Sequence, residues 1–136
     1  MSAITVAKAP CKSCPYRRDV PSGVWSADAY SKLPEYDGGI GGQVSAGATR
    51  AFMCHQQDGK LCAGWVGCHG ASELLALRLQ AALVAPSVWT YKSPVPLFKS
   101  GAAAAAHGMR AIARPGVRAR RTIQQLMRKR EARRDA

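Results

Sequence analysis

Five cysteines in a chain of 136 residues are the side chains best suited to chemistry. Cys11 and Cys14 form a Cys-x-x-Cys pair, which places two thiolates on one tight turn, close enough to share a tetrahedral metal ion. Such a pair needs two more ligands from elsewhere in the chain. The second group of candidates offers a surplus: Cys54, His55, Cys62, Cys68 and His69. The spacing therefore predicts a metal-organised module and leaves its full ligand set open.

The type of ligand determines which metals the site can bind. Thiolates favour Zn²⁺ or an iron–sulfur cluster over the hard ions that prefer oxygen. Zinc is the expected ion, because it can staple a small intracellular module whose core is limited. An iron–sulfur cluster is the alternative, since Pro15 directly after Cys14 is typical of cluster-binding runs. Without a metal, the cysteines would be buried small apolar side chains or a transient redox pair.

The remaining sequence indicates the compartment. Residues 1–10 lack the basic start, apolar run and small-residue cleavage site of a secretory signal. The apolar run of residues 74–84 contains Arg78 and Gln80, so no stretch resembles a membrane span. We therefore expect a soluble cytoplasmic protein, in which clustered cysteines stay reduced and serve metal or redox chemistry.

The two ends of the chain differ in charge. Residues 1–85 contain eight Lys and Arg against six Asp and Glu, whereas residues 86–136 contain twelve against two. Such asymmetry points to an acidic partner for the basic end, most often nucleic acid. The predicted nucleic-acid-binding residues follow one another closely: Arg114, Arg118, Arg120, Arg121, Arg128, Lys129, Arg130, Arg133 and Arg134.

Three interpretations of this basic segment stay open. Contacts to phosphates would give salt-sensitive and largely sequence-independent affinity for nucleic acid. Arginine also pairs with carboxylates, so an acidic surface on a host or phage protein is a second candidate partner. The third interpretation is a solvated helix kept basic for solubility. We expect no membrane partner, because the apolar stripe of the segment is narrow and has no aromatic residue.

The same residues give little evidence of a catalytic site. The zinc-deaminase signature needs a His-x-Glu upstream of its Pro-Cys-x-x-Cys run, and nothing before Pro10 supplies one. The glycine-rich run of residues 37–42 lacks the Gly-Lys-Ser/Thr ending of a phosphate loop. Adjacent pairs such as Cys54–His55 rarely align as nucleophile and base. We therefore expect that the protein is not an enzyme.

Three regions must position these residues. Residues 1–85 form the predicted cysteine-rich metal-binding module, residues 86–100 a proline-rich extended connector, and residues 101–136 a basic helical tail. Within the module, Ser26 is expected to cap a short helix that ends before Pro34.

The longest predicted element of the module is a helix over residues 72–84, capped by Ser72 and buried because it is apolar nearly all round. The glycines of residues 37–42 predict a flexible loop. In the tail, the alanine-rich run predicts a helix over residues 102–113, and Pro115 predicts the first turn of a final helix that ends near Arg134. The fold class is thus a small metal-stapled, mostly α module with irregular loops, followed by a basic α-helical C-terminal extension.

The cysteine spacing resembles that of a family of small proteins from actinobacteria and their bacteriophages, which has no established activity. The shared pattern is C-x-x-C-P-[WY]-R, then F-x-C-H, then C-A-G-W-[LV], followed by an Arg-Leu pair that Arg78 and Leu79 match. The resemblance covers about residues 11–80. It implies that the four metal ligands are Cys11, Cys14, Cys54 and Cys62, with Cys68, His55 and His69 as alternates.

Together these features predict a metal-binding accessory or regulatory protein, encoded by a phage, that binds nucleic acid or transcription or replication machinery through its basic C-terminal helix. One alternative is an iron–sulfur redox sensor, in which Cys68 would be a resolving thiol. Another is an interaction protein that inhibits a host factor through the same helix.

Overall fold

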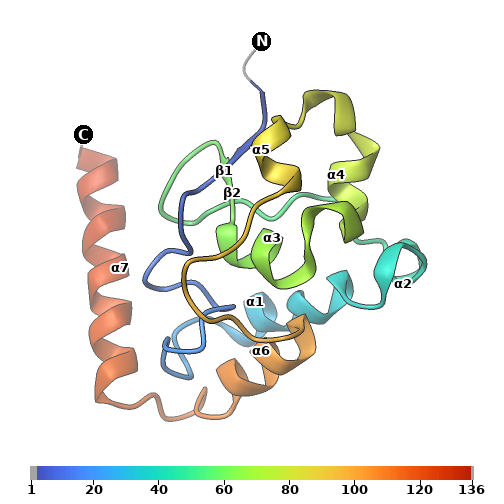
Figure 1. Cartoon of the computed structure of the whole chain (residues 1–136). Coiled ribbons are helices and arrows are strands. Elements are labelled where there is room, and N and C mark those ends of the chain that lie inside the picture. The colour runs from blue at the N-terminus through green and yellow to red at the C-terminus, as the bar shows by residue number, and fades with distance from the viewer. Residues whose placement is uncertain (1–2, 136) are drawn as a thin grey trace.

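Helices account for about half of the chain in the computed structural model, which describes residues 3–135 (Figure 1). The expectation of a mostly α fold is confirmed. The elements follow one another as β1 (Thr5–Val6), α1 (Ala27–Ser31), the 3₁₀ helix η1 (Leu33–Tyr36), α2 (Gly39–Ala46), β2 (Lys60–Leu61), α3 (Ala63–His69), η2 (Ala71–Glu73), α4 (Leu75–Leu79), η3 (Ala81–Leu83), α5 (Pro86–Trp89), α6 (Gly101–Met109) and α7 (Val117–Asp135).

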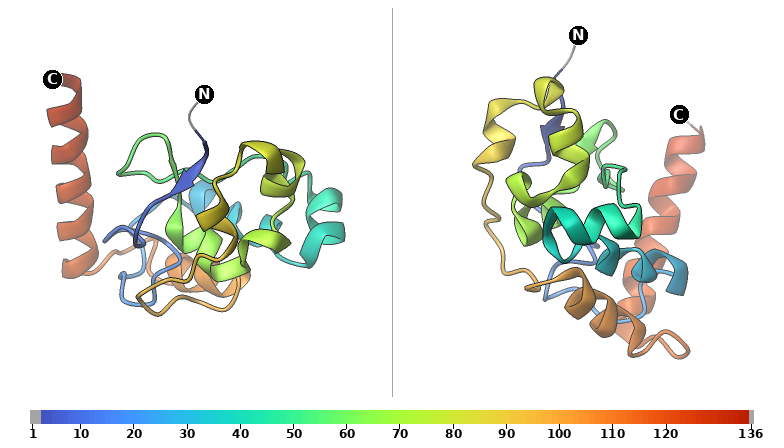
Figure 2. Two further views of the ribbon diagram at one scale, coloured as in Figure 1. Left: turned by 45° about the horizontal axis from the view of Figure 1, so that its top comes forward. Right: turned by 90° about the vertical axis from the view of Figure 1, so that its right-hand side faces the viewer.

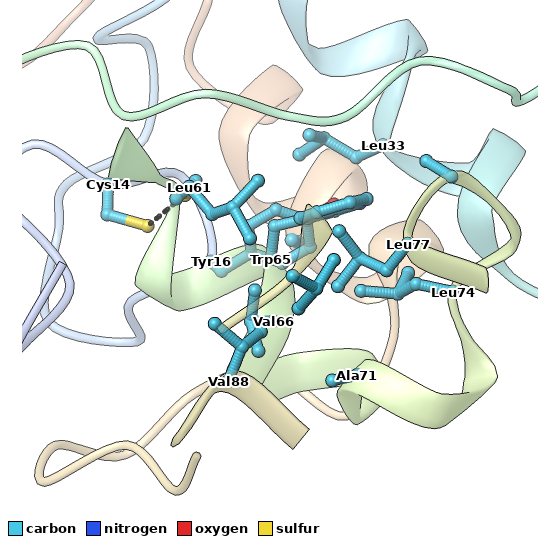
Figure 3. Close-up of a cluster of buried hydrophobic side chains, with 14 of the residues drawn as sticks. Cys14, Tyr16, Leu33, Leu61, Trp65, Val66, Ala71, Leu74, Leu77 and Val88 are labelled. Carbon is cyan, nitrogen blue, oxygen red and sulfur yellow. Dashed lines mark hydrogen bonds between the residues drawn. The ribbon is translucent and has the colours of Figure 1, made fainter. Parts of the chain in front are cut away.

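The core is built around α3 (Figure 3). Trp65 of this helix is fully buried and lies among Tyr16, Leu61 and the leucines that follow α3. The parallel pair β1–β2 joins the N-terminal segment to the strand that leads into α3, with Val6 opposite Leu61. Cys14 lies at one edge of the same core, so the cysteine turn is part of the packed interior.

The predicted helix over residues 72–84 is wrong as one element. The backbone leaves helical geometry at Leu74 (φ −100°, ψ 113°) and at Gln80 (φ −127°, ψ 36°), which separates η2, α4 and η3. These bends let Leu74 and Leu77 enter the core, while Leu79 is 65% exposed and Leu83 46% exposed. A straight helix that is apolar on all sides needs partners all round, and this small core covers only one side.

The glycine-rich run of residues 37–42 is also not a flexible loop, because α2 begins at Gly39. A buried side chain outside that run explains the difference. Gln43 is fully buried, and its amide donates to the carbonyls of Gly39 and Glu73 and accepts from the N–H of Leu75. These three bonds tie α2 to the start of α4, so a tertiary contact overrides the low helix propensity of glycine.

The segment after residue 85 packs on the body of the protein. Residues 86–89 form α5 instead of extended chain, and Val88 is fully buried in the core. Helix α6 begins at Gly101, where a side chain would clash with the carbonyl of Leu33, and is shorter than predicted. Ser100 caps it, and both carboxylate oxygens of Asp37 accept from its first N–H groups, at 2.8 and 2.9 Å.

The predicted cap of the first helix is confirmed. Ser26 caps α1, since its hydroxyl accepts from the N–H of Ala29 at 3.2 Å. The final helix, α7, starts at Val117 and runs to Asp135, so Pro115 precedes the helix and does not lie in its first turn. It stands beside the N-terminal loops at one edge of the molecule (Figures 1 and 2). No helix in the described residues is both long enough and apolar enough to cross a membrane.

Candidate functional site

The first two predicted ligands lie on one tight turn. The N–H of Cys14 donates to the carbonyl of Cys11 at 3.0 Å, and the N–H of Arg17 donates to the carbonyl of Cys14 at 3.1 Å. The Arg17 guanidinium donates to the carbonyl of Pro10 and to both carboxylate oxygens of Asp19. Cys14 is therefore fully buried on a fixed turn, while Cys11 is half-buried.

The other two predicted ligands lie on a short hairpin that leads into α3. The N–H of Cys54 donates to the carbonyl of Lys60, and the N–H of Cys62 donates to the carbonyl of Phe52, both at 2.8 Å. Cys62 is the residue that precedes the first turn of α3. Both cysteines are buried, and this hairpin brings Cys62 to the Cys14 turn.

The thiols of Cys14 and Cys62 are in contact, with their sulfurs 3.8 Å apart. This separation exceeds a disulfide bond of about 2.05 Å. It matches the edge of a tetrahedron around zinc, which is about 3.8 Å for a Zn–S bond of about 2.3 Å. The hydrogen bond from the Cys62 thiol lowers the pKa of Cys14, and the same bond and burial raise the pKa of Cys62.

The other two predicted ligands, Cys11 and Cys54, lie near this pair without completing a coordination shell. Burial, together with the charges of Cys14 and Cys54, raises the pKa of Cys11 to about 11. Within residues 3–135, however, no three Cys, His, Asp or Glu side chains converge closely enough to coordinate one ion. The structure thus brings two predicted ligands into contact, with Cys11 on the same turn as Cys14 and Cys54 on the same hairpin as Cys62.

The alternates have other neighbours. His69 lies 3.5 Å from the hydroxyl of Tyr16 and 3.7 Å from a carboxylate oxygen of Asp37. His55 stacks on Trp25, with ring centroids 4.5 Å apart. Cys68 is half-buried, and burial and the charge of Asp37 raise its pKa to about 12.

Two polar contacts that the sequence did not indicate hold the cysteine turn in place. The indole N–H of Trp25 donates to the carbonyl of Ser13 at 2.8 Å, and the Gln56 amide donates to the Ser13 hydroxyl at 2.8 Å. Gln56 also accepts from the ammonium of Lys129 on α7 at 2.9 Å. No pattern in the sequence signals Gln56, because its role depends on segments far apart in the chain.

Helix α7 docks through its apolar stripe. Ala119 is buried against Val20 and Val24, and Ile123 and Leu126 pack beside them. The opposite faces are polar and solvated. All nine predicted nucleic-acid-binding residues are exposed: Arg114, Arg118, Arg120, Arg121, Arg128, Lys129, Arg130, Arg133 and Arg134.

The basic helix borders the cysteine turn. A cleft of about 290 Å³ separates them, lined by Lys12 and Ser13 of the Cys-x-x-Cys motif and by Arg118, Arg121 and Lys129 of α7. The guanidinium of Arg118 also donates to the carbonyl of Asp19 at 3.2 Å. The two regions that the sequence singled out for chemistry and for charge are therefore neighbours in space.

Comparison with known proteins gives one match. No curated protein and no solved structure matches this chain. The family model that matches, described as a family of unknown function (DUF6283), covers residues 6–124. The matched range includes all five cysteines, α6 and the first part of α7, and so extends well past the residues 11–80 of the sequence resemblance. The chain belongs to the DUF6283 family.

Proposed function

We propose that this chain is an accessory or regulatory protein that binds nucleic acid through α7, on a base stapled by a metal ion at the cysteine turn. One observation carries the proposal: α7 docks by a narrow apolar stripe, while its eight predicted basic residues, and Arg114 just before the helix, all stay exposed. A helix that was basic only for solubility would not need a docked face. Docking fixes the direction in which the arginines point, as a binding surface requires.

Phosphate is the partner that this surface suits best. Along α7, Arg120, Arg121 and Arg128 form no ion pair with any described acidic side chain. Lys12 adds a positive charge across the cleft. Cations without counter-charges attract the phosphate backbone, and release of its counterions makes the affinity fall steeply with salt.

The proposed metal is zinc, held by Cys11, Cys14, Cys54 and Cys62. The support is the 3.8 Å separation of the Cys14 and Cys62 sulfurs and the burial of both side chains. In a [4Fe–4S] cluster, each cysteine binds a different iron, so the cysteine sulfurs stand farther apart than two ligands of one ion. The ion would remove the thiol protons and join the Cys11–Cys14 turn to the Cys54–Cys62 hairpin.

The test of α7 uses the full chain and a matched charge control. The variant Arg120→Gln/Arg121→Gln/Arg128→Gln removes three exposed cations from α7. The control Lys8→Gln/Arg78→Gln/Lys92→Gln removes three exposed cations from other segments. Fluorescence anisotropy with labelled DNA over a range of salt should show weaker binding and a shallower salt dependence for the α7 variant only. The slope should fall by roughly one unit for each phosphate that the variant no longer neutralises.

Equal affinity of both triple variants would contradict the role of α7. If no nucleic acid binds, and one protein is instead captured by the wild-type chain after nuclease treatment, the acidic-protein interpretation replaces this one. Metal analysis with an absorption spectrum, on protein purified without oxygen, tests the staple separately. One zinc per chain without colour supports it, whereas iron with sulfide and visible absorbance would favour the redox sensor.

A further inference from the structure

An aromatic pocket lies on the side of the cysteine hairpin that faces α1. It is a cavity of about 420 Å³, and we define it by Trp25, Tyr30, Tyr36 and Phe52. The volume falls within the range of about 300–1,000 Å³ typical of small-ligand sites. The ring centroids of Tyr36 and Phe52 lie 6.3 Å apart, nearly perpendicular, and the Tyr36 hydroxyl donates to the carbonyl of Arg50 at 3.0 Å.

The pocket has a positive rim. Lys32 and Arg50 both line it and both are exposed. Neither forms an ion pair with a described acidic side chain. A planar ligand with a negative charge at its edge therefore matches the pocket, because the rings offer stacking surfaces and the rim offers free cations.

The aromatic pocket connects to α7. Trp25 and His55 line it, and the same stacked pair lines a smaller cleft of about 60 Å³ together with Arg130 and Arg133. The Arg133 guanidinium donates to the carbonyls of His55 and Gln56. The Trp25–His55 pair thus borders both the aromatic pocket and a cleft that is lined by cations of α7.

We propose that the aromatic pocket receives one unpaired base of a single-stranded nucleic acid whose phosphates lie along α7. This inference rests on the proposed function of α7 and adds that single strands bind more tightly than duplexes. A base within a duplex is stacked between its neighbours and cannot enter the pocket, whereas a base in a single strand can turn onto an aromatic ring. The rim cations would hold the phosphate next to that base.

A free nucleotide presents the same ring and phosphate, but the structure favours the strand. A mononucleotide would use the aromatic pocket and its rim and leave the exposed arginines of α7 without a role. A strand uses both surfaces, because the Trp25–His55 stack joins them. Binding of a strand should therefore depend on the pocket and on α7 together.

The experiment measures binding of probes to the full chain in its purified, metal-bound form. Three probes are labelled: a single-stranded DNA, a strand of the same length with abasic sites, and the matching duplex. AMP is the fourth probe and is added as a competitor. Abasic sites keep every phosphate and remove only the stacking surface. The wild-type chain should bind the intact single strand at least about fivefold more tightly than the abasic strand, and more tightly than the duplex.

Two variants locate the effect. Lys32→Gln/Arg50→Gln changes only exposed rim residues, so its fold should be kept, and Lys8→Gln/Lys92→Gln is its matched charge control. The rim variant should weaken binding of the intact strand several-fold more than the control does. Phe52→Leu, with its fold checked by circular dichroism, should reduce the difference between intact and abasic strands by removing one ring.

The outcomes separate this inference from the function of α7. Equal affinity for intact strand, abasic strand and duplex, with all three lost in the α7 triple variant, would overturn the aromatic pocket and keep α7 as the binding surface. Binding of no nucleic acid at all would overturn both. In the last arm, AMP and unlabelled intact strand are compared as competitors, both counted as the concentration of bases. If AMP displaces half of the labelled strand at the same concentration as the unlabelled strand does, the ligand is a free nucleotide and the strand proposal is overturned.

Discussion

At Gly64, the absence of a side chain leaves room for the Cys14 thiol. A Cβ at this position would clash with the Cys14 sulfur and lie 2.9 Å from the Cβ of Tyr16. The glycine in the Cys-Ala-Gly-Trp run is thus required by packing against a cysteine about fifty positions earlier in the chain. The same closeness that lets Cys14 approach Cys62 excludes any larger residue at position 64 of α3.

We predict that Gly64→Ala displaces the Cys14 sulfur, lowers the metal content of the purified protein and destabilises the fold by about 1–3 kcal/mol. Metal per chain and the urea midpoint measure the two effects. Gly41→Ala is the control, since a Cβ there meets nothing within 4 Å on helix α2. If both variants keep the metal and stability of the parent chain, Cys14 is not held as tightly as the packing indicates.

A second residue-scale prediction concerns Gln43. Its substitution by leucine keeps the volume but leaves the N–H of Leu75 and the carbonyl of Glu73 without their partner. Each buried group left unpaired costs about 1–3 kcal/mol, so Gln43→Leu should lower the free energy of unfolding by more than about 1 kcal/mol. Chemical denaturation checks this against Gln57→Leu, an exposed position where we expect a change of about 0.5 kcal/mol or less.

Among the elements, α7 combines two roles on different faces. Its stripe of Ala119, Ile123 and Leu126 packs on the loop of residues 20–25. Its cations are exposed, and some of them bond to Asp19 or to the hairpin of residues 54–62. Because the contact is narrow, α7 is the element whose docking a single substitution can most easily release. Its position beside the aromatic pocket depends on that docking.

We expect Ala119→Glu to undock α7, because the substitution buries a charge and extra volume against Val20 and Val24. Limited trypsin digestion should then cut the chain after the arginines of α7 many times faster than in the parent chain, while residues 3–110 stay protected from cleavage. Ala132→Glu, exposed on the same helix, is the matched control and should be cleaved at the parent rate. Equal rates for both variants would show that the stripe does not hold α7.

The whole molecule has a core that depends on segments far apart in the chain. Two strands of two residues each, seven α-helices and three 3₁₀ helices in residues 3–135 are joined by turns, and the longest element, α7, lies at the edge. A fold of this kind has few long elements to stabilise it, so a metal that joins the Cys14 turn to the hairpin would contribute to global stability.

We therefore predict that a strong chelator lowers the thermal midpoint of the wild-type chain. Free metal at roughly a hundredfold excess over its dissociation constant stabilises the folded state by about 3 kcal/mol, which corresponds to roughly 10 °C for a chain of this size. Cys14→Ser should bind no metal and show no response to the chelator. Cys68→Ser should respond like the parent; loss of metal from that variant would mean that Cys68 is a ligand.

Local signals in the sequence predicted some elements well. The Ser26 cap of α1, the alanine-rich helix α6 and the final helix depend on residues within a few positions of each other, and each forms close to where it was expected. The prediction of a single helix over residues 72–84 was wrong. The apolar periodicity identifies the buried leucines, but the backbone leaves helical geometry at Leu74 and Gln80. These breaks let Leu74 and Leu77 pack into a small core.

The amino-acid sequence alone specifies the chemistry available to the protein: five thiols, one Cys-x-x-Cys turn and a basic C-terminal helix. Which of these groups meet depends on the tertiary fold. Cys14 reaches Cys62 across 48 positions, Gln43 reaches Glu73 and Leu75, and Trp25 stacks on His55 between the aromatic pocket and α7. Local propensity extends over a few residues, whereas these contacts are selected by the burial of a shared core, which no local pattern encodes.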